Sequence, residues 1–531
     1  MSWLRRLAEP WRARASRKRG TDLERSLLIV SDLHLGRDPG SITGFGHSHR
    51  PSPEHDEALI ALVRHYAAEA PKRWRIILAG DFLDFVEVVV RPDKESALTL
   101  SFEVTKEELA VGLNTEPERA KVKLELILDY HRAAFTALAE LVAAGAELVM
   151  IRGNHDAEMH WGKVQRVMRQ RLAELAFTQK EIPVDELLER RAAFQARIRF
   201  VPWCYVEPGR IYLEHGHQYD PYCSFDHQLY PVSPTNPRQI DTPPFMFAMR
   251  YFVNRLSDFA SHYADFWTLS DYVRWMRQKG LGGTMYTLGM ALEATARLVH
   301  YAAMFWLGRV GRYEDHHAQR LEEEAASYGV PADALRRIDA LHHTPVNRNL
   351  GELMRLLFLD RALLGLGVLS LIGLSLVMVE QPALELLAVV ASLGLGYFVN
   401  RRLEPRRFIL PGPRQAQAAR QIADILGVPL VAMGHSHQRR RVALGSGRYY
   451  FNTGCWLPPH DPEPHAPEDT CTCNLSHLVV EERRAELRLF CRVHGKPRTD
   501  LPPTTPRVPA TDEEDGESSG ASEIATPTEM R

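Results

Sequence analysis

Short apolar runs alternate with polar loops in the first half of the chain. Residues 26–31 (SLLIVS) form a β-branched run that ends in the polar loop DLHLG. A short apolar run bounded by polar residues predicts a buried strand. Four more runs of this kind lie at 75–79, 147–152, 211–214 and 428–433. Helical stretches at 55–68 and 121–143 lie between the first three runs, so the pattern predicts a layered α/β domain.

Each predicted strand is followed by a polar cluster rich in His, Asp and Asn. The carboxyl ends of strands are where α/β folds build their sites, so the clusters are expected to converge. Imidazole, carboxylate and amide donors together suit Mn, Fe or Zn, whereas Ca and Mg prefer oxygen ligands. The candidate donors are Asp32, His34, Asp81, Asp84, Asn154, His155, Asp156, His215, His217, His435 and His437.

These donors are too numerous for one metal ion, which favours a site for two ions. Two cations close together need a bridging carboxylate to offset their repulsion. Such a pair would clamp a phosphate ester and lower the pKa of a bridging water to give a hydroxide nucleophile. The pattern therefore predicts hydrolysis of a phosphate ester.

The motifs D-x-H, GDxxD, GNHD, a strand-terminal His and GHxH, in this order, resemble the calcineurin-like metallophosphoesterase superfamily. The resemblance covers residues 25–215 and 428–495. It implies an α/β fold, a four-layer sandwich of two mixed β-sheets flanked by helices. It also implies two divalent metal ions that share Asp81, with manganese expected first and iron or zinc as alternatives. The other ligands would be Asp32, His34 and His437 on one ion, and Asn154, His215 and His435 on the other.

The same resemblance makes His155 the acid that protonates the leaving oxygen and Asp84 the residue that orients it. Part of the pattern is also similar to the bacterial UDP-diacylglucosamine pyrophosphate hydrolases, which share the strand-linked DLHL, a strand-terminal HG and a lipid-facing inserted cap. Those enzymes carry Arg where this chain has His155. Their specific reaction is therefore not assigned, and mono-, di- and pyrophosphoesters all stay open.

Residues 217–427 form an insertion between the fourth and fifth clusters, far longer than a normal connection. It holds a charge-free run at 362–379 and a second at 386–400, which together predict a transmembrane helical hairpin over 362–400. Arginines lie on both flanks and only glutamates in the turn, so the positive-inside rule places both flanks in the cytoplasm. The alternative is two buried core helices of a soluble cap.

The other segments complete the predicted organisation. Residues 1–22 are basic and predict either an amphipathic helix at an anionic membrane surface or a disordered leader. The catalytic domain would comprise 23–216 and 428–498, and 499–531 would be a disordered acidic, Pro-rich tail. The apolar stretch 281–308 is interrupted by charges and suits an interfacial or core helix better than a span. The expected location is the inner, cytoplasmic membrane, with the catalytic domain facing the cytoplasm.

Composition narrows the function classes. The 531 residues carry 65 Lys and Arg against 67 Asp and Glu, a formal charge of −2, which argues against nucleic acid as a partner. The six cysteines have no paired CxxC spacing and are expected to be reduced thiols in the cytosol. The expected substrate is a phosphoester at the membrane, such as a lipid headgroup phosphate or pyrophosphate. A soluble small-molecule phosphoesterase and a non-catalytic, membrane-tethered metal-binding scaffold are the alternatives.

Several residues keep two interpretations. His47 and His49 lie in a second GHSH that no apolar strand precedes, so they are expected to be a decoy or part of a substrate loop. His217 could replace His215 as a ligand. Asp156 and His160 fit a helix start and a surface histidine. Substrate phosphates could be held by Arg37, Arg152, Arg439, Arg440 and Arg441.

Overall fold

The computed structural model describes residues 25–36, 53–90, 100–178, 182–256, 269–308, 313–403, 411–456, 475–482, 484–491 and 496–499. The predicted basic segment 1–22 lies outside these residues, as do Arg37, His47, His49 and the tail from 500 onward.

The larger of two sheets has seven strands in the order β12-β11-β10-β1-β2-β3-β4. Four of them run parallel: β1 (Ser26–Val30), β2 (Trp74–Ala79), β3 (Glu147–Ile151) and β4 (Ile198–Val201). Three more continue the sheet antiparallel from β1: β10 (Leu475–Glu481), β11 (Arg484–Cys491) and β12 (Lys496–Thr499). The strands β1, β2 and β3 are almost entirely buried, since both faces of the sheet are covered there.

The smaller sheet has five strands in the order β5-β6-β7-β9-β8. Its strands are β5 (Cys204–Glu207), β6 (Ile211–Glu214), β7 (Leu430–Met433), β8 (Arg440–Gly445) and β9 (Arg448–Asn452). β7 is parallel to β6 and β9, whereas the two outer pairs are antiparallel. The prediction of two mixed sheets is therefore confirmed.

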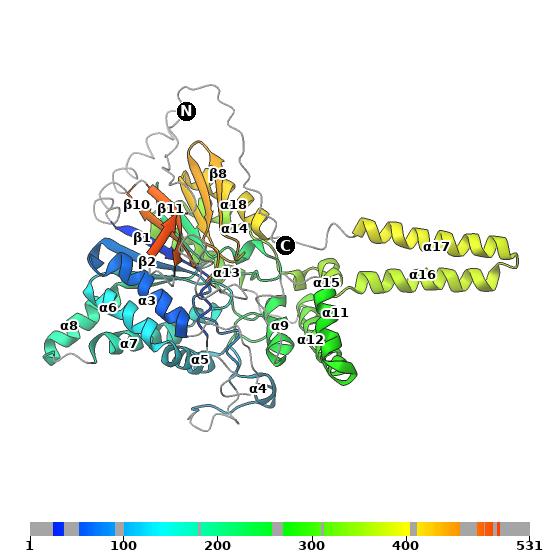
Figure 1. Cartoon of the computed structure of the whole chain (residues 1–531), viewed down its shortest axis with the longest axis horizontal. Helices are drawn as coiled ribbons and strands as arrows, with labels where there is room; N and C mark the ends of the chain where they lie inside the picture. Colours follow the sequence, from blue (N-terminus) through cyan, green and yellow to red (C-terminus); the bar gives the residue numbers. More distant parts are fainter. Residues whose placement is uncertain are drawn as a thin grey trace.

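The two sheets pack face to face, with Leu27, Ile77 and Val149 of one against Leu213 and Phe451 of the other. Four helices cover the outer face of the larger sheet: α3 (Pro53–Ala67), α5 (Pro117–Tyr130), α6 (Arg132–Ala144) and α7 (Gly162–Phe177). Two further helices, α4 (Lys106–Val111) and α8 (Val184–Ala196), lie at its periphery (Figure 1).

The outer face of the smaller sheet is covered by α13 (Glu314–Tyr328), α14 (Ala332–Asp339) and α18 (Pro411–Leu426). These three helices belong to the segment 217–427 that the sequence marks as an insertion. That segment thus supplies the fourth layer of the sandwich as well as the elements that project from it.

The helical stretch predicted over 121–143 forms two helices, α5 and α6, with a break at His131. The buried His131 ring hydrogen-bonds Asp56 of α3 through Nδ1 at 2.7 Å, and its Nε2 contacts the carbonyl of Gly36. Gly36 lies in the loop after β1. The break therefore lets one side chain tie α3 to the loop that carries Asp32 and His34.

The remaining helices are α9 (Pro244–Tyr251), α11 (Leu269–Gln278), α12 (Gly280–Trp306), α15 (Leu350–Leu356), α16 (Leu359–Met378) and α17 (Pro382–Leu403). The last two form a hairpin that projects away from the sandwich (Figure 1).

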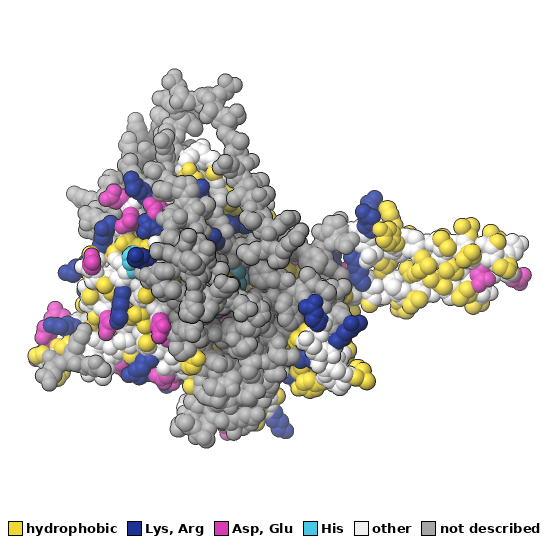
Figure 2. All heavy atoms as spheres, viewed as in Figure 1, with side chains coloured by type: hydrophobic (Ala, Val, Ile, Leu, Met, Phe, Trp, Pro, Cys, Tyr) yellow, Lys and Arg dark blue, Asp and Glu magenta, His cyan; other side chains and the backbone are white. Residues whose placement is uncertain are grey.

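The α16–α17 hairpin is long and apolar enough to cross a membrane. Its helices have 20 and 22 residues and mean hydropathies of 2.0 and 1.8, and only 0% and 6% of their apolar windows are buried. Apolar side chains cover the hairpin along its length (Figure 2). The alternative of two core helices does not fit, since this chain leaves them exposed.

Candidate functional site

The polar clusters meet where β1, β2, β3, β6 and β7 end. Five of the predicted ligands have left-handed backbone conformations, with φ of 53° at Asp32, 49° at His34, 49° at Asp81, 66° at His435 and 55° at His437. Such a conformation is costly for a residue with a Cβ and persists where the surroundings enforce it, most often at functional sites.

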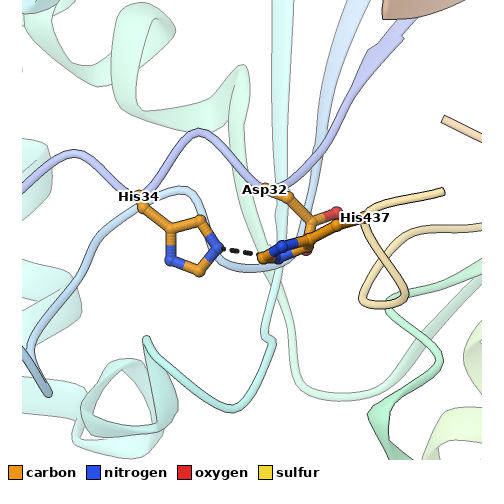
Figure 3. A group of neighbouring side chains, drawn as sticks. All are labelled: Asp32, His34 and His437. Carbon is orange, nitrogen blue, oxygen red and sulfur yellow. Dashed lines mark hydrogen bonds and ion pairs between the residues drawn. The ribbon is translucent and has the colours of Figure 1, made fainter. Parts of the chain in front are cut away.

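The first group of donors comprises Asp32, His34 and His437, whose ligand atoms lie within 4.8 Å of one another. The Nε2 atoms of His34 and His437 are 3.3 Å apart and face each other (Figure 3). His437 Nε2 also lies 3.4 Å from Asp32 Oδ1. Two imidazole nitrogens and a carboxylate converging on one point form a donor set suited to Mn, Fe or Zn.

The second group comprises Asp81, His215 and His435, again with ligand atoms within 4.8 Å. His215 Nε2 lies 3.0 Å from Asp81 Oδ2. Asn154 is buried, and its Oδ1 has no hydrogen-bond partner among the described residues. A buried carbonyl oxygen left in this way is unfavourable unless a ligand satisfies it, and a cation would do so.

Asp81 connects the two groups, because its carboxylate also lies within 4.8 Å of His34 and His155. This is the place that a bridging ligand must take. The residues present therefore fit a pair of divalent cations.

The carboxylates and imidazoles of the site shift one another's pKa values. Burial raises the pKa of Asp81, but the His215 and His155 imidazoles outweigh burial and hold that pKa well below its usual range. Burial lowers the pKa of His215, yet Asp81 and Asp32 raise it to about 9. Cations would displace protons from these groups, as they do whenever a metal binds to imidazole and carboxylate ligands.

His155 and Asp84 form a buried pair beside this centre. His155 Nδ1 lies 3.1 Å from Asp84 Oδ2, and Asp84 Oδ1 accepts a hydrogen bond from the Glu87 backbone at 2.7 Å. Burial disfavours the charged imidazole, but Asp84 and then Asp81 raise the pKa of His155 to about 10. The pair thus combines a proton donor with a residue that orients it.

A comparison with models of known protein families matches residues 25–244 to the calcineurin-like phosphoesterases. These residues form a calcineurin-like phosphoesterase domain. Such a domain implies a metal-dependent phosphoesterase, in agreement with the donor groups. The match includes the strand ends from Asp32 to His215 and stops before the GHSH at 434–437. No curated protein and no solved structure matched the chain.

One residue of this phosphoesterase site was missed by the sequence analysis. Asp220 Oδ2 lies 3.1 Å from His435 Nε2, so Nδ1 is the nitrogen of that ring that would bind a metal ion. A carboxylate on the second nitrogen of a ligand histidine fixes its tautomer and orientation. Asp220 ends the same HGHQYD run that supplies His215, which is the only sequence signal for it.

Two motif glycines have a steric role that the sequence analysis also missed. A Cβ on Gly153 would lie 2.6 Å from the Asp81 backbone nitrogen, as well as against its carboxylate. A Cβ on Gly434 would meet the Asp32 carboxylate and lie 2.8 Å from Ser31 Cβ. Both distances are far below van der Waals contact. The GNHD and GHSH glycines therefore let the ligand loops close on the two aspartates.

The alternative candidates lie beside the centre. His217 is buried and its Nε2 lies 3.1 Å from Gln228 Oε1, outside the donor groups of the described chain. Asp156 is buried and does not cap the helical turn that follows it. Instead it accepts hydrogen bonds from the Gly153 backbone at 2.6 Å and the Phe82 backbone at 3.1 Å, which joins the GNHD and GDFLD loops.

The arginines proposed for substrate phosphates are placed differently from one another. Arg152 is buried and donates to the Gln228 carbonyl, and it lines a separate cavity of about 220 Å³ with His160 and Arg320. Arg440 and Arg441 begin β8, and Arg440 donates to Gln438 at 2.8 Å. None of these contacts reaches the donor groups among the described residues.

Proposed function

We propose that this protein is a dinuclear metallophosphoesterase that hydrolyses a phosphoester at the cytoplasmic face of a membrane. The observation that carries the proposal is the pair of donor groups that meet at Asp81, with His155 and Asp84 beside them. A structural role would not require seven buried or half-buried polar side chains to converge, five of them at strained backbone positions.

Each side chain has a task in this reaction. One cation would be held by Asp32, His34, Asp81 and His437, and the other by Asp81, Asn154, His215 and His435. Bound there, the cations would polarise the phosphoryl group and lower the pKa of a water molecule.

His155 gives a proton to the leaving oxygen, while Asp84 holds its Nδ1 and keeps the ring charged until the transfer. Asp84 Oδ2 also lies 3.3 Å from Nδ1 of His34, so one carboxylate orients both a ligand and the acid. The geometry of the site does not select among mono-, di- and pyrophosphoesters.

The membrane part of the proposal is supported by the α16–α17 hairpin. Arg361 near its start donates to the Asn400 carbonyl at 2.7 Å, which joins the two helices at their base. Arg401 and Arg402 follow at the same end, whereas Glu380 and Glu385 lie at the tip. By the positive-inside rule, this distribution of charge supports a cytoplasmic location for the base and the catalytic domain.

The catalytic part is tested with detergent-purified protein that is first stripped of metal and then loaded with Mn²⁺. Hydrolysis of p-nitrophenyl phosphate and bis-p-nitrophenyl phosphate is expected to depend on Mn²⁺ and to be lost in Asp81→Asn. Asp129→Asn is the matched control, since Asp129 is exposed on α5 and paired with Arg171. Two bound ions without turnover on either ester would favour the scaffold alternative.

Membrane attachment is tested separately by fractionating cells that express the full chain. A requirement for detergent is expected. Release of the intact protein by high salt alone would contradict the spanning hairpin and favour a soluble phosphoesterase with a helical cap.

A further inference from the structure

Helix α12 is apolar on two opposite sides. On its inner side, Leu298 and Ala302 pack against Phe247 of α9, and Met290 packs against Trp275 of α11. The helix is therefore well anchored to the protein. This contact covers only part of its apolar surface.

The outer side of α12 carries an exposed apolar stripe. The stripe consists of Leu281, Met285, Leu288, Leu292, Val299 and Trp306, which repeat every three, four or seven residues and so share one face. Leu281 is 82% exposed and Leu292 is 70% exposed. A helix that is apolar all round is normally covered all round, and soluble proteins rarely expose contiguous patches of this kind.

The charged residues of α12 are turned away from the stripe. Glu293 pairs with Arg255 at 2.7 Å, and Arg297 lies 3.8 Å from Glu107 and close to Glu293. No other Asp, Glu, Lys or Arg occurs between Gly280 and Trp306, so the stripe is uncharged over the length of the helix.

Helix α12 lies close to the base of the α16–α17 hairpin, because it packs with Leu353 of α15, the helix that precedes α16. Figure 1 shows α11 and α12 beside this base, running across the direction in which the hairpin projects. The cations Arg274, Arg277 and Lys279 lie at the end of α11, next to the start of α12. An apolar face bordered by cations is the pattern of a helix that lies in the headgroup region of an anionic bilayer.

We propose that α12 lies in the interface of the bilayer that the hairpin spans, with its stripe among the lipids. This inference rests on the proposed membrane insertion of the hairpin. The protein then contacts the membrane through two elements, which fixes its orientation, whereas a hairpin alone would leave the catalytic domain free to tilt.

The proposal also limits where the substrate lies. Phe247 of α9 packs on α12, while Phe245 of the same helix has its ring centroid 5.3 Å from that of His155. A single helix thus separates the stripe from the catalytic histidine. With about 8–10 Å between packed helix axes, the site lies within roughly 20 Å of the lipid surface. The expected substrate is an amphiphile whose phosphoester stands in the headgroup layer.

The test uses the full chain reconstituted into vesicles that contain phosphatidylglycerol and a lipid with a photoactivatable acyl chain. Mass spectrometry then locates the cross-linked residues. Labels are expected on the hairpin and on Leu281, Leu288 and Leu292. Val184 and Leu188 of α8 are the matched control, because they are 73% and 64% exposed but lie on the side of the sandwich away from the hairpin (Figure 1).

Each outcome has a distinct meaning. A labelled hairpin with an unlabelled α12 would overturn this inference and leave the membrane anchor intact. Equal labelling of α8 and α12 would also overturn it, as unspecific contact with lipid. An unlabelled hairpin would contradict the proposed membrane insertion itself, on which the inference rests.

A pair of variants adds a second readout. Leu292→Asp places a charge on the stripe and is expected to reduce labelling of α12 by about tenfold, with hairpin labelling unchanged. Leu188→Asp is the control and should change neither. Undiminished labelling of α12 in Leu292→Asp would contradict contact between the stripe and the lipids.

Discussion

Replacing His155 with glutamine tests the role of this residue as the proton donor to the leaving group. Glutamine keeps a polar side chain of similar size but cannot give up a proton. Burial lowers the pKa of His155, but Asp84 and Asp81 raise it above its usual value, which favours the protonated ring. The variant cannot supply this proton.

The size of the effect depends on the leaving group. General acid catalysis contributes about a hundredfold to ten-thousandfold in rate, or about 3–5 kcal/mol of barrier. An alkyl phosphoester releases a basic alkoxide and should lose this full factor in kcat/KM. A p-nitrophenyl ester releases a stabilised phenolate that needs little protonation, and it should lose less than about tenfold.

The assay measures kcat/KM for an alkyl and a p-nitrophenyl ester on Mn-loaded protein of verified metal content. His160→Gln is the control, since His160 follows in the same loop but contacts Arg152 and Tyr230 away from the donor groups. Equal losses on the two esters in His155→Gln would refute the role of proton donor and indicate that the ring binds or positions substrate instead.

Three further predictions concern other parts of the protein. Asp220→Asn should weaken Mn²⁺ binding by about 10–100-fold, measured by calorimetry, with kcat recovered at high Mn²⁺; an unchanged affinity would contradict its role in orienting His435. Gly153→Ala should displace Asp81, lower the metal content and reduce the free energy of unfolding by about 1–3 kcal/mol, and a normal metal content would contradict the steric argument. Burial, and to a lesser degree Arg488, lower the pKa of His477 from 6.5 to about 3. Between these two pH values the unfolded chain therefore binds one more proton than the folded chain. The free energy of unfolding should fall by about 1.4 kcal/mol for each pH unit as pH drops from 6.5 towards 3. Urea titrations of His477→Gln should show a correspondingly flatter pH dependence.

The strands that carry the site could be predicted because the local sequence of each one indicates that it is buried and where it ends. In β1, for example, an unbroken apolar run covered on both faces stops at Ser31, and the polar residues begin at once. The hairpin could be predicted for the same reason, since long charge-free runs indicate apolar helices without reference to distant residues. The structure starts its first helix at Leu359 and ends its second at Leu403, slightly beyond the predicted 362–400.

Features that depend on distant contacts could not be predicted. Asp220 contacts His435, which lies 215 positions later in the chain. The sequence around Asp220 does not indicate this contact. His131, at the break between α5 and α6, likewise contacts Asp56, 75 positions earlier. Local helical periodicity continues through His131, so the residues around it do not predict a break.

The fourth layer of the sandwich also could not be predicted from local sequence. The sequence marks α13 and α14 as polar, amphipathic helices, but it does not indicate which surface their apolar faces cover. Leu321 and Leu335 are buried against the smaller sheet together with Ile422 of α18, which follows the hairpin. The chain thus leaves the sandwich for the hairpin and returns to it, an arrangement that helical patterning alone does not specify.

The central claim is that Asp81 joins two metal ions, and counting the ions tests it most directly. Metal-stripped protein titrated with Mn²⁺ should bind two ions per chain, with an exchange-coupled electron paramagnetic resonance spectrum. His437→Ala should retain one ion, and Asp81→Asn should lose the coupling. A single ion per chain in the wild type, or two ions without coupling, would contradict the account.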